Sequence, residues 1–197
     1  MRGTVHPVRR MDLCTSVERQ FGSAQIQVLS FADLYAGKLA AALSRQHPRD
    51  LFDIGVLLDN TGIDIALWQT FLVYLTASPK PAADILAPAA PRDLAAVFES
   101  QFQGMTREPV TVEWLLEARI RLLAKMRELM DAPTCNFLLS VEREVPDFTI
   151  INLPDASHLP GVRRKLQNLA QRSAVKRESD YRQLAETLER IAKQGPK

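Results

Sequence analysis

Lys38, Asp50 and Asp53 are the residues of this sequence whose types and spacing could do chemistry together. A helical projection at about 100° per residue places Lys38 among apolar residues. A cation there must reach solvent, lose its hydration or meet an anion, and losing hydration without a partner costs several kcal/mol. We therefore expect the lysine to face carboxylates or phosphate. The alternative is that it snorkels to the rim of the apolar stripe or pairs with a core carboxylate.

The first element that must position these groups is a helix starting at Ser30. Ser30 is a suitable N-cap, and Asp33 can reach back toward the free amides of the first turn. Arg45 falls on the same side of this helix as Lys38. The expected apolar stripe consists of Phe31, Leu34, Tyr35, Leu39 and Ala42.

A second helix follows directly. Pro48 ends the first helix and suits the first turn of the next, where Asp50 complements the positive helix end. Asp50 and Asp53 share a face with Ile54 and Leu57 at spacings of three and four residues. Two carboxylates on one helix and a lysine on the other can therefore form one site in a helical hairpin.

The string LSFADLYAGKLAAALSRQHPRDLFDIGVLL resembles the signature of the AbiEii/AbiGii toxin nucleotidyltransferases, in which a lysine helix, a basic loop and an Arg-Asp-x-x-Asp helix follow a strand. The matching residues are Lys38, Arg49, Asp50 and Asp53, and 15 positions separate the lysine from the last aspartate (53 − 38). A second string, FLLSVEREVPDFTIINLPDASHLPGVRRKLQNL, is similar to the C-terminal segment of that family. Two matches about 100 residues apart, in the right order, are more specific than either one.

This resemblance implies a nucleotidyltransferase-type toxin of a bacterial toxin-antitoxin or abortive-infection system, which transfers a nucleotide from an NTP to a tRNA-like RNA acceptor. It assigns Lys38 and Asp53 to catalysis. It assigns Lys38, Arg49 and Asp50 to nucleotide binding, and Arg45 joins them because it falls on the same side of its helix as Lys38. It also implies Mg²⁺ and an NTP for the complete enzyme, with tRNA and a cognate antitoxin protein as partners.

The family's metal-binding residues are a Gly-Ser followed by Asp-x-Asp on strands upstream of the lysine helix, and the metals hold the triphosphate. The chain contains Gly22-Ser23, but Asp33 is followed by Tyr35 where a second aspartate would be needed. We therefore expect an inactive chain without its own metal site, produced by truncation, a misassigned start or gene loss. The alternative is a non-catalytic helical interaction module for an antitoxin or partner subunit, which an exposed strand edge at 24–29 would support.

A basic segment near the C-terminus is the candidate for RNA contact. Residues 161–177 contain six basic side chains and no acidic one. Such a patch on a helix attracts phosphate backbones, although a solvated face without a ligand explains it equally well. The six residues are Arg163, Arg164, Lys165, Arg172, Lys176 and Arg177.

Composition indicates an ordinary globular protein, with 46% hydrophobic and 24% charged residues and a net charge of +2 over 197 residues. No apolar run approaches 18 residues and no signal core is present, so we expect a cytoplasmic protein without a membrane partner. Cys14, Cys135 and the three histidines lack the spacing of metal ligands.

The expected fold class is α+β, predominantly α-helical, with a partial nucleotidyltransferase sheet edge followed by a helical domain. Further helices are expected from Asp64, at 92–101, from Thr111, from Pro160 and at 179–193. The expected parts are 1–78, a remnant of the nucleotidyltransferase core; 79–91, a Pro-rich linker; and 92–197, a helical domain with one or two short strands, for which 135–141 and 148–153 are the candidates.

Overall fold

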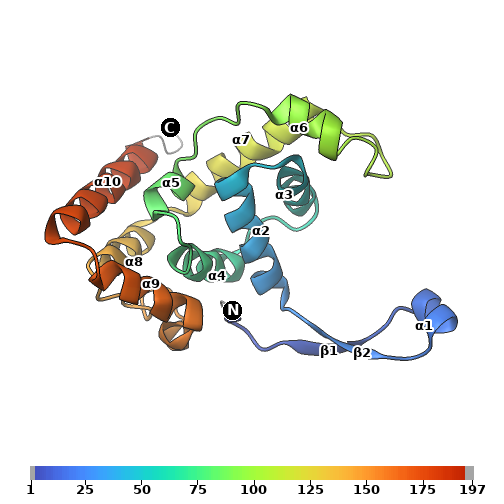
Figure 1. Cartoon of the computed structure of the whole chain (residues 1–197), viewed down its shortest axis with the longest axis horizontal. Helices are drawn as coiled ribbons and strands as arrows, with labels where there is room; N and C mark the ends of the chain where they lie inside the picture. The colour runs from blue at the N-terminus through green and yellow to red at the C-terminus, as the bar shows by residue number, and fades with distance from the viewer. Residues whose placement is uncertain (1–2, 194–197) are drawn as a thin grey trace.

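The computed structural model describes residues 3–193 and consists mainly of helices around one core (Figure 1). Within these residues the strands form a single two-stranded antiparallel sheet, so the predicted, predominantly helical α+β class is confirmed. The elements are β1 (Arg9–Asp12), α1 (Thr15–Phe21), β2 (Gln25–Val28), α2 (Phe31–Arg45), α3 (Pro48–Asn60), α4 (Ile65–Thr76), α5 (Ala82–Leu86), α6 (Leu94–Gln101), α7 (Val112–Leu129), α8 (Ala132–Glu142), the 3-10 helix η1 (Pro154–His158), α9 (Pro160–Ala170) and α10 (Ala174–Lys193).

The N-terminal hairpin of β1 and β2 extends away from the helices, with α1 at its far end (Figure 1). The predicted strand at 24–29 is confirmed as β2. Helix α1 was not predicted, because its seven residues bury no side chain and so show no apolar periodicity.

Helix α2 begins at the predicted N-cap, where the Ser30 hydroxyl accepts a hydrogen bond from the Asp33 amide at 2.9 Å. The Asp33 carboxylate has a different role from the one expected. It is buried and accepts hydrogen bonds from the amides of Val5 at 2.7 Å and His6 at 2.9 Å. Asp33 therefore ties the N-terminal segment to the helical body.

The predicted apolar stripe of α2 is wrong for its first turn, because Phe31 and Leu34 are exposed. The buried face keeps Leu39 and Ala42 of the predicted stripe and adds Ala36, Ala40 and Leu43. Helix α2 packs mainly against α4. Small alanines between two leucines allow close helix approach, and this second stripe has the same helical spacing as the predicted one. Lys38 consequently lies on the open side of α2.

Helix α3 begins at Pro48 as predicted, and the His47 side chain accepts a hydrogen bond from the Arg49 amide at 3.2 Å. Leu51, Ile54 and Leu57 are fully buried. Gly55 faces the Trp114 indole of α7 so closely that a Cβ at position 55 would overlap the ring. The glycine therefore permits the close contact between α3 and α7.

Helix α4 crosses the centre of the molecule, where Trp68 and Phe71 are core residues as predicted. The same hydrophobic core includes residues from Ala36 to Ile191. Helix α5 contributes Ile85 and Leu86 from within the predicted linker. Helices from the first and last predicted parts and the predicted linker thus contribute to one hydrophobic core within the described residues.

The prediction of short strands in the C-terminal part is wrong. Residues 135–141 lie in α8. The N-cap of this helix is Asp131, whose carboxylate accepts a hydrogen bond from the Thr134 amide at 2.8 Å. Phe137, Leu138 and Val141 share a buried helical face, and residues 148–153 form turns. Short apolar runs do not distinguish a strand from a buried helix. No helix of the described chain is long and apolar enough to cross a membrane.

Candidate nucleotide site on the helical hairpin

Lys38 of α2 and Asp53 of α3 form an ion pair across the helical hairpin. The Lys38 Nζ lies 2.6 Å from the Asp53 Oδ2, and the two side chains are 30% and 28% exposed. The Lys38 ammonium group also lies 5.6 Å from the centre of the Tyr35 ring. The lysine therefore meets a carboxylate, as its sequence position suggests, but at a half-exposed rim where an incoming anion can reach it.

Arg45 and Asp50 form a second link between the same helices. The Arg45 Nε donates to the Asp50 Oδ2 at 3.1 Å, and the Arg45 Nη2 donates to the Asp50 Oδ1 at 2.8 Å. The carboxylate is mostly buried, while the guanidinium is largely exposed. Two parallel charge-assisted bonds fix the orientation of the guanidinium and leave its other N–H groups free for a ligand.

Beside this pair lies a pocket of about 430 Å³ where the end of α2, the start of α3 and the start of α6 meet. Arg45, Arg49 and Arg92 line it, with Asp50 and Asp93. The Arg49 Nη2 contacts only the Met105 sulfur, at 3.8 Å, and no carboxylate of the described residues pairs with Arg49 or Arg92. The pocket therefore offers guanidinium groups to an anion.

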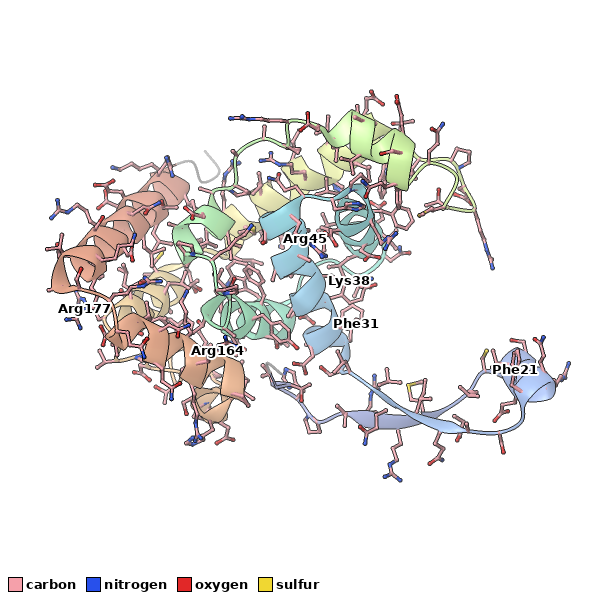
Figure 2. All side chains as sticks on the ribbon, viewed as in Figure 1. Phe21, Phe31, Lys38, Arg45, Arg164 and Arg177 are labelled. Carbon is pink, nitrogen blue, oxygen red and sulfur yellow. The ribbon has the colours of Figure 1, made fainter. Side chains whose placement is uncertain are left out.

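The structure brings the predicted nucleotide residues to one hairpin in two neighbouring groups. Arg45, Arg49 and Asp50 line the pocket, while the Lys38–Asp53 pair lies outside it. Lys38 precedes Arg45 by seven residues, which corresponds to about 10 Å along the helix axis. Figure 2 shows both side chains on α2.

The carboxylates of this site do not fit a Mg²⁺ centre. Asp50 and Asp53 each pair with a cationic side chain, and residues 3–193 contain no group of three or more His, Cys, Asp or Glu side chains that could hold a metal ion. Mg²⁺ prefers several oxygen ligands in octahedral geometry. The described residues of this site therefore lack the set of oxygen ligands that such a centre needs.

The structure gives the six basic residues of the predicted RNA patch different surroundings. Lys165 is buried, and its Nζ donates to the carbonyl oxygens of Ser78 at 3.0 Å and Lys80 at 3.2 Å, just beyond α4. Burial lowers the pKa of Lys165 and raises the pKa of the neighbouring Glu142. Lys165 therefore holds α9 against the end of α4.

Three more of the six residues pair with internal carboxylates. Arg172 and Lys176 both contact the buried Asp180, each at 2.6 Å, and Arg177 pairs with Glu144 at 2.7 Å. Arg163 and Arg164 are exposed and have no acidic partner among residues 3–193. Arg163 lies 3.2 Å from the His158 ring nitrogen. Figure 2 shows Arg164 and Arg177 on the C-terminal helices.

Sequence reasoning missed Arg92 as a pocket residue and the acidic partners of the basic segment. Arg92 lies 43 positions after Arg49 (92 − 49), and nothing in the sequence links the two. Asp180 follows the basic segment by three residues (180 − 177), and this acidic residue at its border is the signal that could have indicated internal pairing. Glu142 lies 19 residues before the segment (161 − 142) and gives no such signal.

The helical hairpin therefore carries two ion pairs, Lys38–Asp53 and Arg45–Asp50, beside an arginine-lined pocket. The family model of the nucleotidyl transferase AbiEii toxin, of a type IV toxin-antitoxin system, matches residues 1–133. This match covers more than half of the chain, which therefore belongs to this family. No curated protein and no solved structure matches the chain.

Proposed function

We propose that the chain is a toxin of the nucleotidyltransferase type whose α2–α3 hairpin binds an NTP for transfer to a tRNA-like RNA acceptor. Family membership supports nucleotidyl transfer, with an NTP and a divalent metal as the general requirement of the family. The observation that carries the proposal is the Lys38–Asp53 pair, which keeps an ammonium group at an open rim beside an arginine-lined pocket.

Each residue of the hairpin has a proposed role. The Lys38 ammonium group binds a phosphate oxygen, and Asp53 holds the lysine in place until the nucleotide arrives. Arg49 supplies a guanidinium to the same polyanion, and Asp50 orients Arg45 toward it through two hydrogen bonds. These groups act by positioning and by offsetting negative charge, which are the main protein contributions to phosphoryl transfer.

We further propose that residues 1–197 alone bind an NTP without transferring the nucleotide. Both hairpin carboxylates are engaged by cations, and the described residues form no metal cluster. Incubation of the purified chain with labelled NTP, magnesium and tRNA is expected to leave the RNA unlabelled. Label transfer that depends on Lys38 would contradict this part of the proposal while supporting the enzyme class.

Nucleotide binding is the direct test of the site. Lys38→Ala is expected to weaken NTP binding about 10-fold to 100-fold, the value of one charge-assisted hydrogen bond. Lys125→Ala is a matched control, because Lys125 is as exposed as Lys38 and also pairs with a carboxylate. Equal affinities of the two variants would refute the role of Lys38.

For the RNA acceptor, we propose that Arg163 and Arg164 make the main electrostatic contacts, with Arg172, Lys176 and Arg177 contributing their exposed parts. The support is that the first two lack internal acidic partners among the described residues. Arg163→Glu with Arg164→Glu should reduce tRNA affinity and lower the slope of affinity against salt concentration. An unchanged salt slope would remove RNA contact from this surface.

The second candidate is an interaction module for an antitoxin or partner subunit, and the exposed N-terminal hairpin favours it. All four residues of β1 are exposed, so its outer edge is open to another strand. Wild-type binding of NTP that is lost in Lys38→Ala would favour the enzyme class over this candidate.

A further inference from the structure

The N-terminal hairpin has an apolar face that no described part of the chain covers. In its register Met11 pairs with Ile26, and Arg9 pairs with Val28, so these side chains share one face of the sheet. Met11 and Ile26 are each 48% exposed. A two-stranded hairpin alone is marginally stable in water, and a sheet of three or more strands is the usual remedy.

The outer edge of β1 presents backbone groups for one particular pairing. The Leu13 amide donates to the Ala24 carbonyl of the other strand at 3.2 Å. Backbone groups alternate in direction along a strand, so Leu13, Met11 and Arg9 turn theirs toward β2. Arg10 and Asp12 therefore turn their N–H and C=O groups outward, and two donors and two acceptors line the free edge.

The charges of β1 are complementary to those of a second β1 strand. Two identical strands can pair in antiparallel fashion about a two-fold axis perpendicular to the sheet, with one residue opposite its own copy at the centre. Centring on Met11 places Arg10 opposite Asp12 of the second copy, and Asp12 opposite Arg10 of the second copy. Centring on Arg10 or Asp12 would oppose like charges, which is destabilising.

The same centring on Met11 suits the backbone. It makes Arg10 and Asp12 of the two copies the hydrogen-bonded pairs, and these are the residues whose backbone groups point outward. The two Met11 side chains then meet as a non-hydrogen-bonded pair on the apolar face. Charge and hydrogen-bond direction therefore select the same register.

We infer that two copies of this chain associate through their β1 edges and form a four-stranded antiparallel sheet. The antiparallel arrangement directs the tip of each hairpin toward the body of the other copy. Phe21 at that tip is 74% exposed, and Phe31 is exposed at the base of α2 (Figure 2). Leu34, in the first turn of α2, is also exposed. Contact between these apolar groups adds buried area to the strand pairing.

Sedimentation equilibrium of the full chain tests the inference. The wild type should approach twice the monomer mass of 22.1 kDa as concentration rises. Asp12→Arg should raise the dimer dissociation constant at least about 10-fold, because it opposes like charges at both ends of the pair. Adding Arg10→Asp to Asp12→Arg restores both ion pairs and should recover the dimer.

Glu99→Arg is the matched control, because Glu99 is exposed on α6, away from the hairpin, and the substitution makes the same charge change without altering the strand edge. It should leave the dissociation constant unchanged. A wild type that stays monomeric, or a dimer that Asp12→Arg weakens and the double exchange does not restore, would overturn the inferred register.

Disulfide trapping gives an independent readout. In a Cys14→Ser background, Met11→Cys should oxidise to a covalent dimer, since the Cα atoms of non-hydrogen-bonded pairs lie about 4.5 Å apart, within disulfide range. Gln27→Cys lies on β2, the strand farther from the proposed interface, and is the control that should remain monomeric. Equal amounts of disulfide-linked dimer from both variants, or none from either, would contradict the pairing of the two β1 strands.

Discussion

At the scale of single residues, the structure uses charged side chains in two ways. Lys38 and Asp53 pair at an accessible rim, whereas Lys165, Asp180 and Glu142 are buried between C-terminal helices. A half-exposed pair has solvent and ligands within reach, and a buried group must keep its internal partners. This difference separates the candidate nucleotide site from the charges that hold the fold together.

The buried Glu142 predicts a pH dependence of stability. Burial raises the pKa of the Glu142 carboxyl above its ordinary value of 4.5 in the folded state. At pH values between 4.5 and the raised pKa, the folded state therefore binds more protons than the unfolded state. Stability from this group is therefore lost as pH rises through that interval. Glu142→Gln should remove this loss of stability with rising pH. Urea unfolding measured from pH 4 to pH 7 checks the prediction.

Glu189→Gln is the control for this pH dependence, because Glu189 is exposed and its ion pair with Lys193 is long, at 3.5 Å. Its profile should follow that of the wild type. A Glu142→Gln profile that also follows the wild type would show that Glu142 does not titrate differently in the folded state.

At the scale of elements, the contact between α3 and α7 depends on the absence of a side chain at Gly55. Gly55→Ala should destabilise the protein by about 1–3 kcal/mol, because the added methyl group would overlap the Trp114 ring and force it to move. Gly37→Ala is the matched helical control, since its Cβ would meet Tyr74 at an ordinary 3.6 Å. That control should be neutral or slightly stabilising.

The unfolding free energies of the two variants are compared by urea unfolding, with one common dependence of that free energy on urea concentration. Equal effects of Gly55→Ala and Gly37→Ala would show that the α3–α7 contact relaxes without cost, contrary to the packing described here.

The attachment of the N-terminal segment depends on the Asp33 carboxylate. It accepts hydrogen bonds from the Val5 and His6 amides and from the hydroxyl groups of Ser30 and Tyr74. Asp33→Ala should speed hydrogen exchange at the amides of residues 5 and 6 and lower stability by about 1–3 kcal/mol, since half-buried donors lose their acceptor. Unchanged exchange at both amides would show that the segment is held by other contacts.

At the scale of the whole molecule, local signals predicted much of the fold. Ser30, Pro48, Asp64 and Thr111 begin helices where the sequence indicates, because capping depends on residues within one turn. The strands expected at 135–141 and 148–153 are absent. The prediction failed because a short apolar run does not reveal whether it forms a strand or a buried helix, which depends on the neighbours that cover it.

Tertiary contacts explain what sequence could not show about the sites. The Lys38–Asp53 and Arg45–Asp50 pairs link adjacent helices, so their spacing was sufficient to suggest them. Lys165 binds carbonyl groups more than 80 positions away, and this depends on where α9 packs. The apolar stripe of α2 was misassigned because two stripes with helical spacing exist and only the position of α4 decides between them.

The measurement that most directly tests the nucleotide site compares NTP binding by calorimetry in the wild type, Lys38→Ala and Asp53→Asn. If Lys38 binds phosphate and Asp53 only holds it beforehand, the alanine variant should bind more weakly and the asparagine variant more tightly, because the competing negative charge is gone. Opposite shifts are the predicted result. Equal weakening in both variants would show that the pair only stabilises the hairpin, and no change in either would exclude it from nucleotide binding.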